Sequence, residues 1–308
     1  MSAATSPVSG FTVAGTEIVD AKGQPFIIRG INHAHTWYKD DIDAALISIA
    51  ATGANLVRVV LSNGQQWTKD HAASVANVLA LCKQHQLIAM LEVHDATGSD
   101  DLLTLQQAVS YWTDLSPVLI GQEDRVIINI ANEWFGSWSS YAWSVGYEFA
   151  IAALRDAGLE HLLVIDTAGY GQYSQAILDY GQELLKRDRL ARLAFSLHMY
   201  EYAAADTDTL KRNIDDVKAL GLPLIIGEFG DRVPETHPID LDTLMRYTEE
   251  QSVGWIAWSW YGNGGVDAVL DLSSGPQDSF ALTSWGKTAV EGDNGIKLTA
   301  KPCSIFSS

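Results

Sequence analysis

Two glutamates follow apolar segments of this sequence and are of the right type to share acid/base chemistry. Glu133 follows VIINIAN, and Glu228 follows LPLIIG. A carboxylate at the edge of a buried segment costs free energy unless something solvates it, so such a residue is usually an ion-pair member or a catalyst. Two of them indicate a pair in which one carboxyl group holds a proton and the other is ionised.

Cleavage of a glycosidic bond is a reaction that needs such a pair, because one carboxyl group protonates the leaving oxygen while the other attacks or activates water. In a retaining enzyme the two groups lie about 5 to 5.5 Å apart. Arg58 and Tyr200 are of the right type to hydrogen-bond the anion of Glu228. This favours Glu228 as the nucleophile, and its charge favours the protonated form of Glu133 as the acid/base.

Further polar and aromatic residues end other apolar segments. Asn132 has an amide that suits a sugar 2-hydroxyl, a contact that strengthens in the transition state. Trp258 has a flat face that suits the floor under the reacting sugar. Most other tryptophans are expected in the core, and only Trp37 and Trp260 are added as sugar contacts.

The elements that must position these residues are short apolar segments alternating with amphipathic segments of helical period. The expected strands are FIIRGIN at 26, NLVRVVL at 55, LIAMLEV at 87, RVIINIA at 125, HLLVIDT at 161, LAFSLHM at 193, LPLIIGE at 222 and GWIAWSW at 254. Eight strands with crossover helices predict a single (β/α)8 TIM barrel of the α/β class, in which strand ends meet at one mouth. An open doubly wound sheet usually has fewer strands, and no glycine-rich phosphate turn follows residue 32.

The remaining sequence adds no second folding unit. Residues 1–10 read as an N-terminal tail, and residues 11–308 as the barrel domain. The segment FTVAGTEIVDAKGQPF at its start predicts a short β-hairpin that closes the bottom of the barrel. Neither a linker rich in Ser, Pro and Gly nor a low-complexity segment interrupts the chain.

Composition excludes several classes of protein. With 47% hydrophobic and 19% charged residues the 308-residue chain is expected to fold compactly. Its formal net charge of −18 disfavours nucleic acid and anionic membranes as partners. We expect no membrane span, because no segment has about 18 consecutive apolar residues. The start, MSAATSPVSG, lacks a signal-peptide pattern, so the chain is either cytoplasmic or a mature secreted form, of which we expect the latter.

The two cysteines and the histidines admit other interpretations. Cys82 and Cys303 cannot make a metal site by themselves, and we expect a disulfide that ties the C-terminal tail to a helix. A zinc cluster with Glu92 or Asp95 is the alternative use of four histidines at strand ends, although carboxyl catalysis needs no metal or other cofactor. These histidines are His33, His35, His94 and His198.

The whole pattern resembles glycoside hydrolase family 5, of clan A, and most of all its bacterial β-mannanases. The resemblance covers nearly the whole chain and is carried by INHAHTWY at 31, GANLVRVVLSNG at 53, LEVHDATG at 91, INIANEW at 128, FSLHMYEY at 195, IIGEFG at 225 and WIAWSWYGNGG at 255. It implies Glu133 as acid/base and Glu228 as nucleophile. The substrate-binding residues that it implies or that adjoin its motifs are Arg58, His94, Asn132, His198, Tyr200, Trp258, Trp37, His35, Asn63 and Trp260.

The expected activity is therefore endo-acting, retaining hydrolysis of β-1,4-mannosidic linkages in mannan, galactomannan and glucomannan by a secreted monomer. One departure from the family pattern is Tyr170, where these mannanases often have Trp before Gly-Gln. An endo-β-1,4-glucanase on the same scaffold, or a barrel that binds carbohydrate without cleaving it, are the alternatives. The glucanase would differ from a mannanase in the contacts that bind the sugar 2-hydroxyl, which is axial in mannose. A barrel that only binds carbohydrate would lack one of the two glutamates or its partners.

Overall fold

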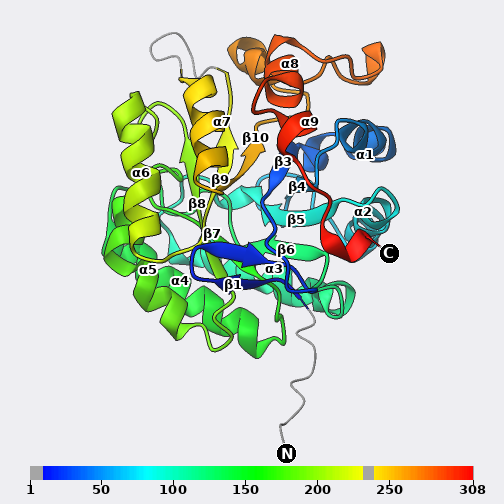
Figure 1. Cartoon of the computed structure of the whole chain (residues 1–308). Coiled ribbons are helices and arrows are strands. Elements are labelled where there is room, and N and C mark those ends of the chain that lie inside the picture. Colours follow the sequence, from blue (N-terminus) through cyan, green and yellow to red (C-terminus); the bar gives the residue numbers. More distant parts are fainter. Residues whose placement is uncertain (1–9, 232–238, 308) are drawn as a thin grey trace, which may run out of the picture.

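Eight parallel strands form a closed barrel, with the helices packed around it (Figure 1). The structure is a computed structural model that describes residues 10–231 and 239–307. Each strand pairs with its neighbour in parallel in the order β10-β3-β4-β5-β6-β7-β8-β9, which confirms the predicted (β/α)8 barrel. The barrel strands are β3 (Arg29–His33), β4 (Leu56–Leu61), β5 (Ile88–Val93), β6 (Val126–Asn129), β7 (Leu163–Asp166), β8 (Leu193–Met199), β9 (Leu224–Phe229) and β10 (Gly254–Ala257).

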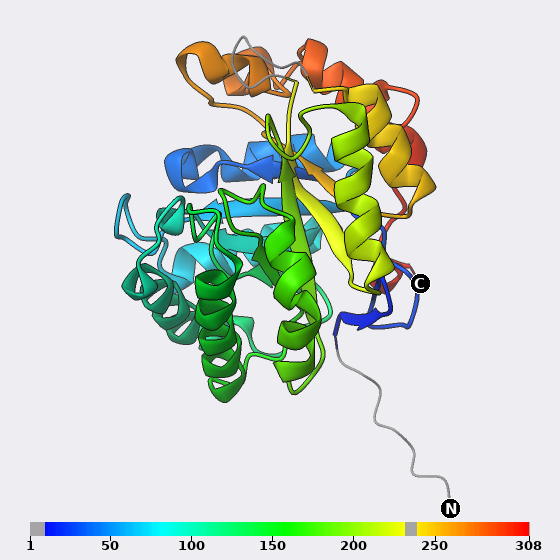
Figure 2. The same cartoon turned by 90° about the vertical axis from the view of Figure 1, so that its left-hand side faces the viewer.

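The helices cover the outer face of the barrel, as the two side views show (Figures 1 and 2). In helix α1 (Ile42–Ala51) the buried residues are Ile42, Ala45, Leu46 and Ile49, which occupy the i, i+3, i+4 and i+7 positions of an amphipathic helix. The helices are α1 (Ile42–Ala51), α2 (Ala72–Gln84), α3 (Leu102–Leu119), α4 (Ser140–Asp156), α5 (Gln175–Arg187), α6 (Thr207–Ala219), α7 (Leu241–Glu250), α8 (Ser284–Glu291) and α9 (Ile296–Thr299). Within the residues described, none has both the length and the apolar character that crossing a membrane requires.

A two-stranded antiparallel hairpin closes the bottom of the barrel, as the sequence predicted (Figure 1). It consists of β1 (Thr12–Ala14) and β2 (Glu17–Val19), joined through Gly15 at φ 61°. Phe11, Ile18 and Phe26 pack into the same core cluster as apolar residues from all eight barrel strands or their edges. Burial of these three side chains is what fixes the hairpin to the barrel. Of the predicted N-terminal tail, residues 1–9 lie outside the described residues.

Strand alternation divides the barrel interior into an apolar lower layer and a polar upper layer. Along β4, Leu56 belongs to the lower core inside the barrel, whereas Val57 and Val59 belong to the core under the helices. Since side chains alternate, Arg58 faces inward one layer above Leu56. The inward polar residues of the upper layer, taken around the barrel, are Asn32, Arg58, Glu92, Asn129, Asp166, His198 and Glu228.

Candidate active site

Arg58 is the centre of the polar layer and has no exposed surface. Its guanidinium donates to Oδ1 of Asn129 at 2.9 Å, of Asn32 at 2.9 Å and of Asn132 at 2.7 Å, and to Oε1 of Glu228 at 2.8 Å. Burial alone would lower the pKa of Arg58, but the surrounding carboxylates raise it above its ordinary value. The planar fork of donors therefore aligns residues from β3, β6, the loop after β6 and β9 in one fixed arrangement.

A bulge in β9 turns Glu228 toward this centre. Ile225 packs inside the barrel and Ile226 packs outside, so regular alternation would place the next inward side chain at position 227. The register with β8 shifts here: Leu197 pairs with Ile226, whereas His198 pairs with Glu228. The residue passed over is Gly227, where a Cβ would lie 2.3 Å from Oγ of Ser196. Glycine thus permits the bulge, and the bulge places Glu228 in the cleft.

Glu228 is held by two donors, which are the two expected from the sequence. Arg58 donates to Oε1 at 2.8 Å, and the hydroxyl of Tyr200 donates to Oε2 at 3.1 Å. Burial and the charge of Glu228 raise the pKa of Tyr200 well above its ordinary value, so the hydroxyl keeps its proton. A carboxylate with a guanidinium on one oxygen and a hydroxyl on the other is stabilised as the anion.

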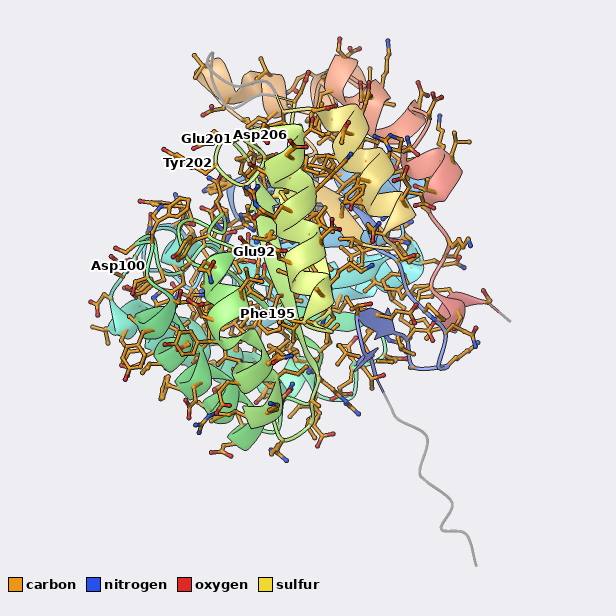
Figure 3. All side chains as sticks on the ribbon, turned by 60° about the vertical axis from the view of Figure 1, so that its left-hand side comes forward. Glu92, Asp100, Phe195, Glu201, Tyr202 and Asp206 are labelled. Carbon is orange, nitrogen blue, oxygen red and sulfur yellow. The ribbon has the colours of Figure 1, made fainter. Side chains whose placement is uncertain are left out.

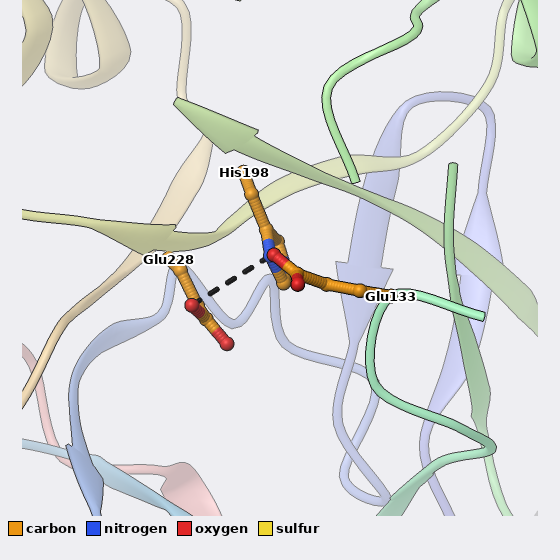
Figure 4. Close-up of side chains that lie close together, drawn as sticks. All are labelled: Glu133, His198 and Glu228. Atoms are coloured by element: carbon orange, nitrogen blue, oxygen red, sulfur yellow. Dashed lines mark hydrogen bonds and ion pairs between the residues drawn. The ribbon is translucent and has the colours of Figure 1, made fainter. Parts of the chain in front are cut away.

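Glu133 is held differently, on a left-handed residue in the loop after β6. Its φ is 47°, and its backbone N–H donates to Oδ2 of Asp166 at 3.0 Å. Nδ1 of His198 lies 2.8 Å from Oε1 of Glu133 and 3.7 Å from Oε2 of Glu228. The imidazole therefore stands between the two glutamates, as the close-up shows (Figure 4).

The separation of the glutamates is short. One carboxylate oxygen of Glu133, Nδ1 of His198 and one carboxylate oxygen of Glu228 all lie within 4.8 Å of one another. The nearest carboxylate oxygens are therefore closer than the roughly 6.5 to 9.5 Å that separates the carboxyl groups of inverting enzymes, and they are compatible with the roughly 5 to 5.5 Å of retaining enzymes. The two groups can therefore act on the two sides of one anomeric centre.

An aromatic floor lies beside the glutamates. Trp258 stacks on His94 with ring centroids 5.6 Å apart, and Nδ1 of His94 lies 2.9 Å from Oε1 of Glu92. Burial lowers the pKa of His94, but the nearby charge of Glu92 more than compensates and raises it. Trp37, of which 38% is exposed, meets His94 edge-on at 5.3 Å. These contacts give a rigid apolar surface of the kind that a sugar ring stacks on.

Asn132 is oriented by two hydrogen bonds. Its Oδ1 accepts from Arg58, and its Nδ2 donates to Oγ1 of Thr97 at 2.8 Å. The amide has a second N–H, so it retains one donor for a ligand.

On the other side of Glu133 the cleft opens into a hollow of about 440 Å³. Three exposed aromatic residues line it, with exposures of 50% for Trp138, 49% for Tyr170 and 60% for Tyr202. In Figure 3, Tyr202 lies at the rim, well above Glu92, which lies inside the barrel. The hollow has room and stacking faces for further sugar residues.

Two predicted sugar contacts are not brought to the cleft. His35 is 1% exposed, and its Nε2 lies 3.5 Å from Oδ1 of Asp70. Trp260 is 1% exposed and stacks on Phe280. Both side chains are packed on all sides, so the prediction that they contact substrate is corrected to a structural role.

Asn63 lies at the upper end of β4, but its polar atoms serve the loop. Its Oδ1 accepts from the backbone of Gln65 at 3.1 Å, and its own N–H donates to Asp95 at 3.0 Å. The side chain is 9% exposed, so only its edge is open to a ligand.

The predicted disulfide is wrong, because both cysteines are free and buried. Cys82 packs in the core under α2, whereas Cys303 packs in the lower core inside the barrel. Sγ of Cys303 lies 3.6 Å from Oδ2 of Asp20, a residue of the hairpin region. The two thiols therefore belong to different core clusters on opposite sides of the sheet.

The four histidines of the alternative zinc interpretation do not converge on one point in the part of the chain that the structure describes. Among the described residues, the one group of three whose ligand atoms come together is Glu133, His198 and Glu228. His94 is paired with Glu92, and His35 faces Asp70. The cluster weighed from the sequence is therefore not assembled among the described residues. In the group that does come together, His198 hydrogen-bonds Glu133, and Glu228 accepts from Arg58 and Tyr200.

Several residues of the site were not selected from the sequence. Asp166 ends the segment LLVID and contacts both Glu133 and His198, and Asn129 accepts from Arg58. The rule that selected Glu133, a polar residue at the end of an apolar segment, would also have selected Asp166. Trp138 was expected in the core with most of the tryptophans, and its exposure of 50% corrects that prediction. Trp138 and Tyr202 both come from loops, where residue type does not show which way a side chain points.

Comparison with known proteins agrees with this geometry. Residues 19–264 match the family model described as cellulase (glycosyl hydrolase family 5). The mannan endo-1,4-beta-mannosidase of Salipaludibacillus agaradhaerens is 49% identical over 97% of this chain and 96% of its own length.

Solved structures give the same result. The beta-mannanase from Thermomonospora fusca is 42% identical, superposes with a TM-score of 0.91 and is matched over 97% of this chain and 100% of its own. The mannohexaose complex of that enzyme is 41% identical over 97% of this chain and 100% of its own, with a TM-score of 0.89. With its barrel, its paired glutamates and these likenesses, the chain belongs to glycoside hydrolase family 5.

Proposed function

We propose that this protein is an endo-β-1,4-mannanase that hydrolyses mannan, galactomannan and glucomannan with retention of configuration. Glu228 is the nucleophile and Glu133 is the acid/base. The observation that carries the proposal is the pair of carboxylate oxygens within 4.8 Å of each other, one of them held by Arg58 and Tyr200. The substrate class is supported by the relatives, which are named mannan endo-1,4-beta-mannosidase and beta-mannanase.

The first step forms a covalent ester. An oxygen of the Glu228 carboxylate attacks the anomeric carbon, and the bond from that carbon to the glycosidic oxygen breaks. The proton of Glu133 moves to the departing oxygen, which leaves as the hydroxyl of the shortened chain. The amide of Asn132 donates its remaining N–H to the sugar 2-hydroxyl, and this contact strengthens as positive charge develops on the ring.

The second step reverses the roles at Glu133. Its carboxylate, ionised after the first step, takes a proton from a water molecule whose oxygen attacks the anomeric carbon. The bond to Glu228 breaks, and both carboxyl groups return to their starting states. Water enters from the hollow beside Glu133, because the leaving sugar has vacated that side.

Two aromatic regions support cleavage inside a chain. The Trp258 and Trp37 surface holds sugars on the nucleophile side, and the hollow with Trp138, Tyr170 and Tyr202 holds sugars beyond the cleaved bond. A cleft with sites on both sides of the reacting bond binds a polymer in its middle. In this proposal Arg58 and His198, which are fully buried, act on the substrate through the glutamates that they hold. The residues that line the substrate site are His94, Asn132, Tyr200, Trp258 and Trp37, with the exposed edge of Asn63.

We further propose that the enzyme acts outside the cell as a monomer on β-mannan. The net charge of −18 and the size of the polymeric substrate support this setting. Light scattering on the purified protein measures the mass of the particle, and a dimer mass would overturn the monomer. The extracellular fraction of a culture should contain the activity.

The reaction itself is tested with mannohexaose followed by proton NMR from the first turnover. We expect the β-anomer of the product to appear first and the α-anomer to follow by mutarotation. An α-anomer formed first would overturn the retaining mechanism. Initial rates on galactomannan, glucomannan and carboxymethyl cellulose test the substrate, and faster cleavage of the cellulose derivative would overturn the choice of mannan.

A further inference from the structure

Asp166 is a fully buried carboxylate behind the acid/base residue. Its Oδ1 accepts from Nδ2 of Asn129 at 3.2 Å, and its Oδ2 accepts from the backbone N–H of Glu133 at 3.0 Å. The same Oδ2 lies 3.5 Å from Nε2 of His198 and 3.7 Å from a guanidinium nitrogen of Arg58. Asp166 has no exposed surface, so it does not reach the substrate itself.

The contact with the backbone fixes where Glu133 stands. A non-glycine residue at φ 47° is less favourable than one in the right-handed region by about 1 kcal/mol, so the loop needs a contact that selects this conformation. The hydrogen bond from the Glu133 N–H to a buried carboxylate provides it, because charge-assisted bonds of this kind are among the stronger ones.

The contact with His198 fixes the direction of the imidazole. Two glycines pack against the ring: a Cβ on Gly171 would lie 2.7 Å from Cγ of His198, and one on Gly227 would lie 3.1 Å from Nε2. The ring therefore lies between two backbone segments, with Nδ1 toward Glu133 and Nε2 toward Asp166. Nε2 has no hydrogen-bond partner among the described residues, and its contact with Asp166 is an ion pair at 3.5 Å.

The groups that face this imidazole set its charge. They are Asp166 from β7, Glu133 from the loop after β6 and Glu228 from β9, and the positive charge of Arg58 from β4 lies 3.7 Å from the same Asp166 carboxylate. Burial lowers the pKa of His198, but the charges of Glu228 and Asp166 prevail and raise it well above its ordinary value. Conversely, burial would raise the pKa of Asp166, and the charge of His198 is foremost among the influences that keep it well below its usual range.

We propose that Asp166 is a positioning residue for the acid/base. It fixes Glu133 directly, by accepting a hydrogen bond from the Glu133 backbone N–H. It also fixes Glu133 through His198, because its contact with Nε2 orients the ring so that Nδ1 donates to the Glu133 carboxylate. This inference rests on the proposed role of Glu133. In the first step the donor stabilises the carboxylate that forms when Glu133 gives up its proton, and in the second step it keeps that carboxylate aimed at water.

The test replaces the charge of Asp166 and reads His198 directly. Asp166→Asn and Asp166→Ser both remove the charge, and Asp156→Asn, an exposed position at the end of α4, is the matched control. NMR of ¹⁵N-labelled histidine, with the His198 signals assigned by loss in His198→Gln, reports the protonation of the ring without any substrate. We expect an imidazolium at pH 7 in the parent, and a titration moved down by about one to two pH units in whichever Asp166 variant folds.

The pH dependence of kcat/KM on mannopentaose gives a second readout with a defined sign. If His198 loses its charge with Asp166, a cation close to both glutamates disappears, and both limbs of the profile move to higher pH. If His198 keeps its charge, removal of the Asp166 anion moves both limbs to lower pH. The second outcome, or an unchanged His198 titration, overturns the proposal.

A rate measurement separates positioning from simple loss of structure. On mannopentaose we expect kcat to fall about 10- to 100-fold with little change in KM, whereas a dinitrophenyl β-mannoside, whose leaving group needs no proton, should form the ester at nearly the parental rate. Equal losses in both ester-forming rates would overturn the proposal. If the parent enzyme itself failed to cleave mannan, the proposed function would fail while the NMR result on His198 still stood.

Discussion

Glu228 and Glu133 meet across one cleft, but the protein holds them in two different ways. The side that we propose as the nucleophile side, made of Glu228, Arg58 and Tyr200, is built on strands or directly after one, and the Glu228 side chain is 6% exposed. The side that we propose as the acid/base side, made of Glu133, His198 and Asp166, depends on a left-handed loop residue, and the Glu133 side chain is 13% exposed. The first side keeps one charge constant in a fixed place, whereas the second must exchange a proton with an incoming or leaving group.

The difference suggests that each glutamate is held as firmly as its proposed step in the reaction requires. An anion that attacks carbon gains from donors that never move, and a guanidinium with four partners provides that. A proton carrier needs access to the hollow where the leaving sugar departs and water arrives. The acid/base side is therefore oriented from behind by buried groups while its front stays open.

The largest expected effect comes from removing the nucleophile. Glu228→Ala should lower kcat on galactomannan by on the order of 10⁵ or more, because no other carboxylate occupies its position. The exposed Glu250→Gln on α7 is the control and should keep the parental rate. Reducing-sugar release measures both, and substantial mannan hydrolysis by a pure, folded Glu228→Ala sample would contradict the assignment.

Removal of the acid/base should have a smaller effect that depends on the leaving group. Glu133→Gln should lower kcat on mannan by about 10² to 10⁴, since general acid catalysis contributes that much. On a dinitrophenyl β-mannoside the same variant should release one equivalent of phenolate rapidly and then stall, and azide should restore turnover. A burst from Glu228→Ala and none from Glu133→Gln would mean that the two sides have been exchanged.

Arg58→Lys tests how far the nucleophile side depends on the shape of its donor. Lysine keeps the charge but cannot reproduce the planar fork that serves three asparagines and Glu228. We expect kcat to fall about 100-fold and the melting temperature to drop, because buried acceptors lose their donors. Initial-rate assays measure kcat, and thermal unfolding measures the melting temperature. An unchanged kcat would show that a positive charge at position 58 is enough for the nucleophile side to function.

The smallest effect is expected from Tyr200→Phe, which removes one of the two donors to Glu228. Loss of one hydrogen bond to a charged group costs about 1.5 to 3 kcal/mol, which corresponds to a loss of roughly 10- to 100-fold in kcat/KM. Because the hydroxyl stabilises the ionised form, the acidic limb of the pH profile should move to higher pH. A shift confined to the alkaline limb would place Tyr200 on the acid/base side instead.

The sequence predicted the barrel because its strands are short, apolar and separated by helices of clear period. It predicted Glu133, Glu228 and the two donors of Glu228 because polar residues at strand ends gather at one mouth. The bulge at Gly227 was not predicted, although regular alternation would have turned Glu228 away from the cleft. A one-residue shift in register depends on packing against β8, and a single sequence does not reveal it.

Other misassignments have the same origin, since residue type does not determine direction. His35 and Trp260 have side chains that suit a sugar site, but neighbouring residues bury them. Tyr202 and Trp138 were passed over because loop residues follow no periodicity. A disulfide was predicted because the sequence has two cysteines. Their positions in separate core clusters depend on the closed sheet between them, which the sequence does not show.

The burial of those thiols has a practical consequence. Burial raises the pKa of Cys82 and of Cys303 to about 12, and neither side chain is more than 2% exposed. Thiolate is the reactive species, so maleimides and aromatic disulfides should react with the native enzyme only when it opens. The rate of labelling therefore measures how often the protein opens. Labelling of Cys82 reports opening of the core under the helices, and labelling of Cys303 reports opening of the lower core inside the barrel. A cysteine introduced at the rim could then carry a fluorophore without competition from the native pair.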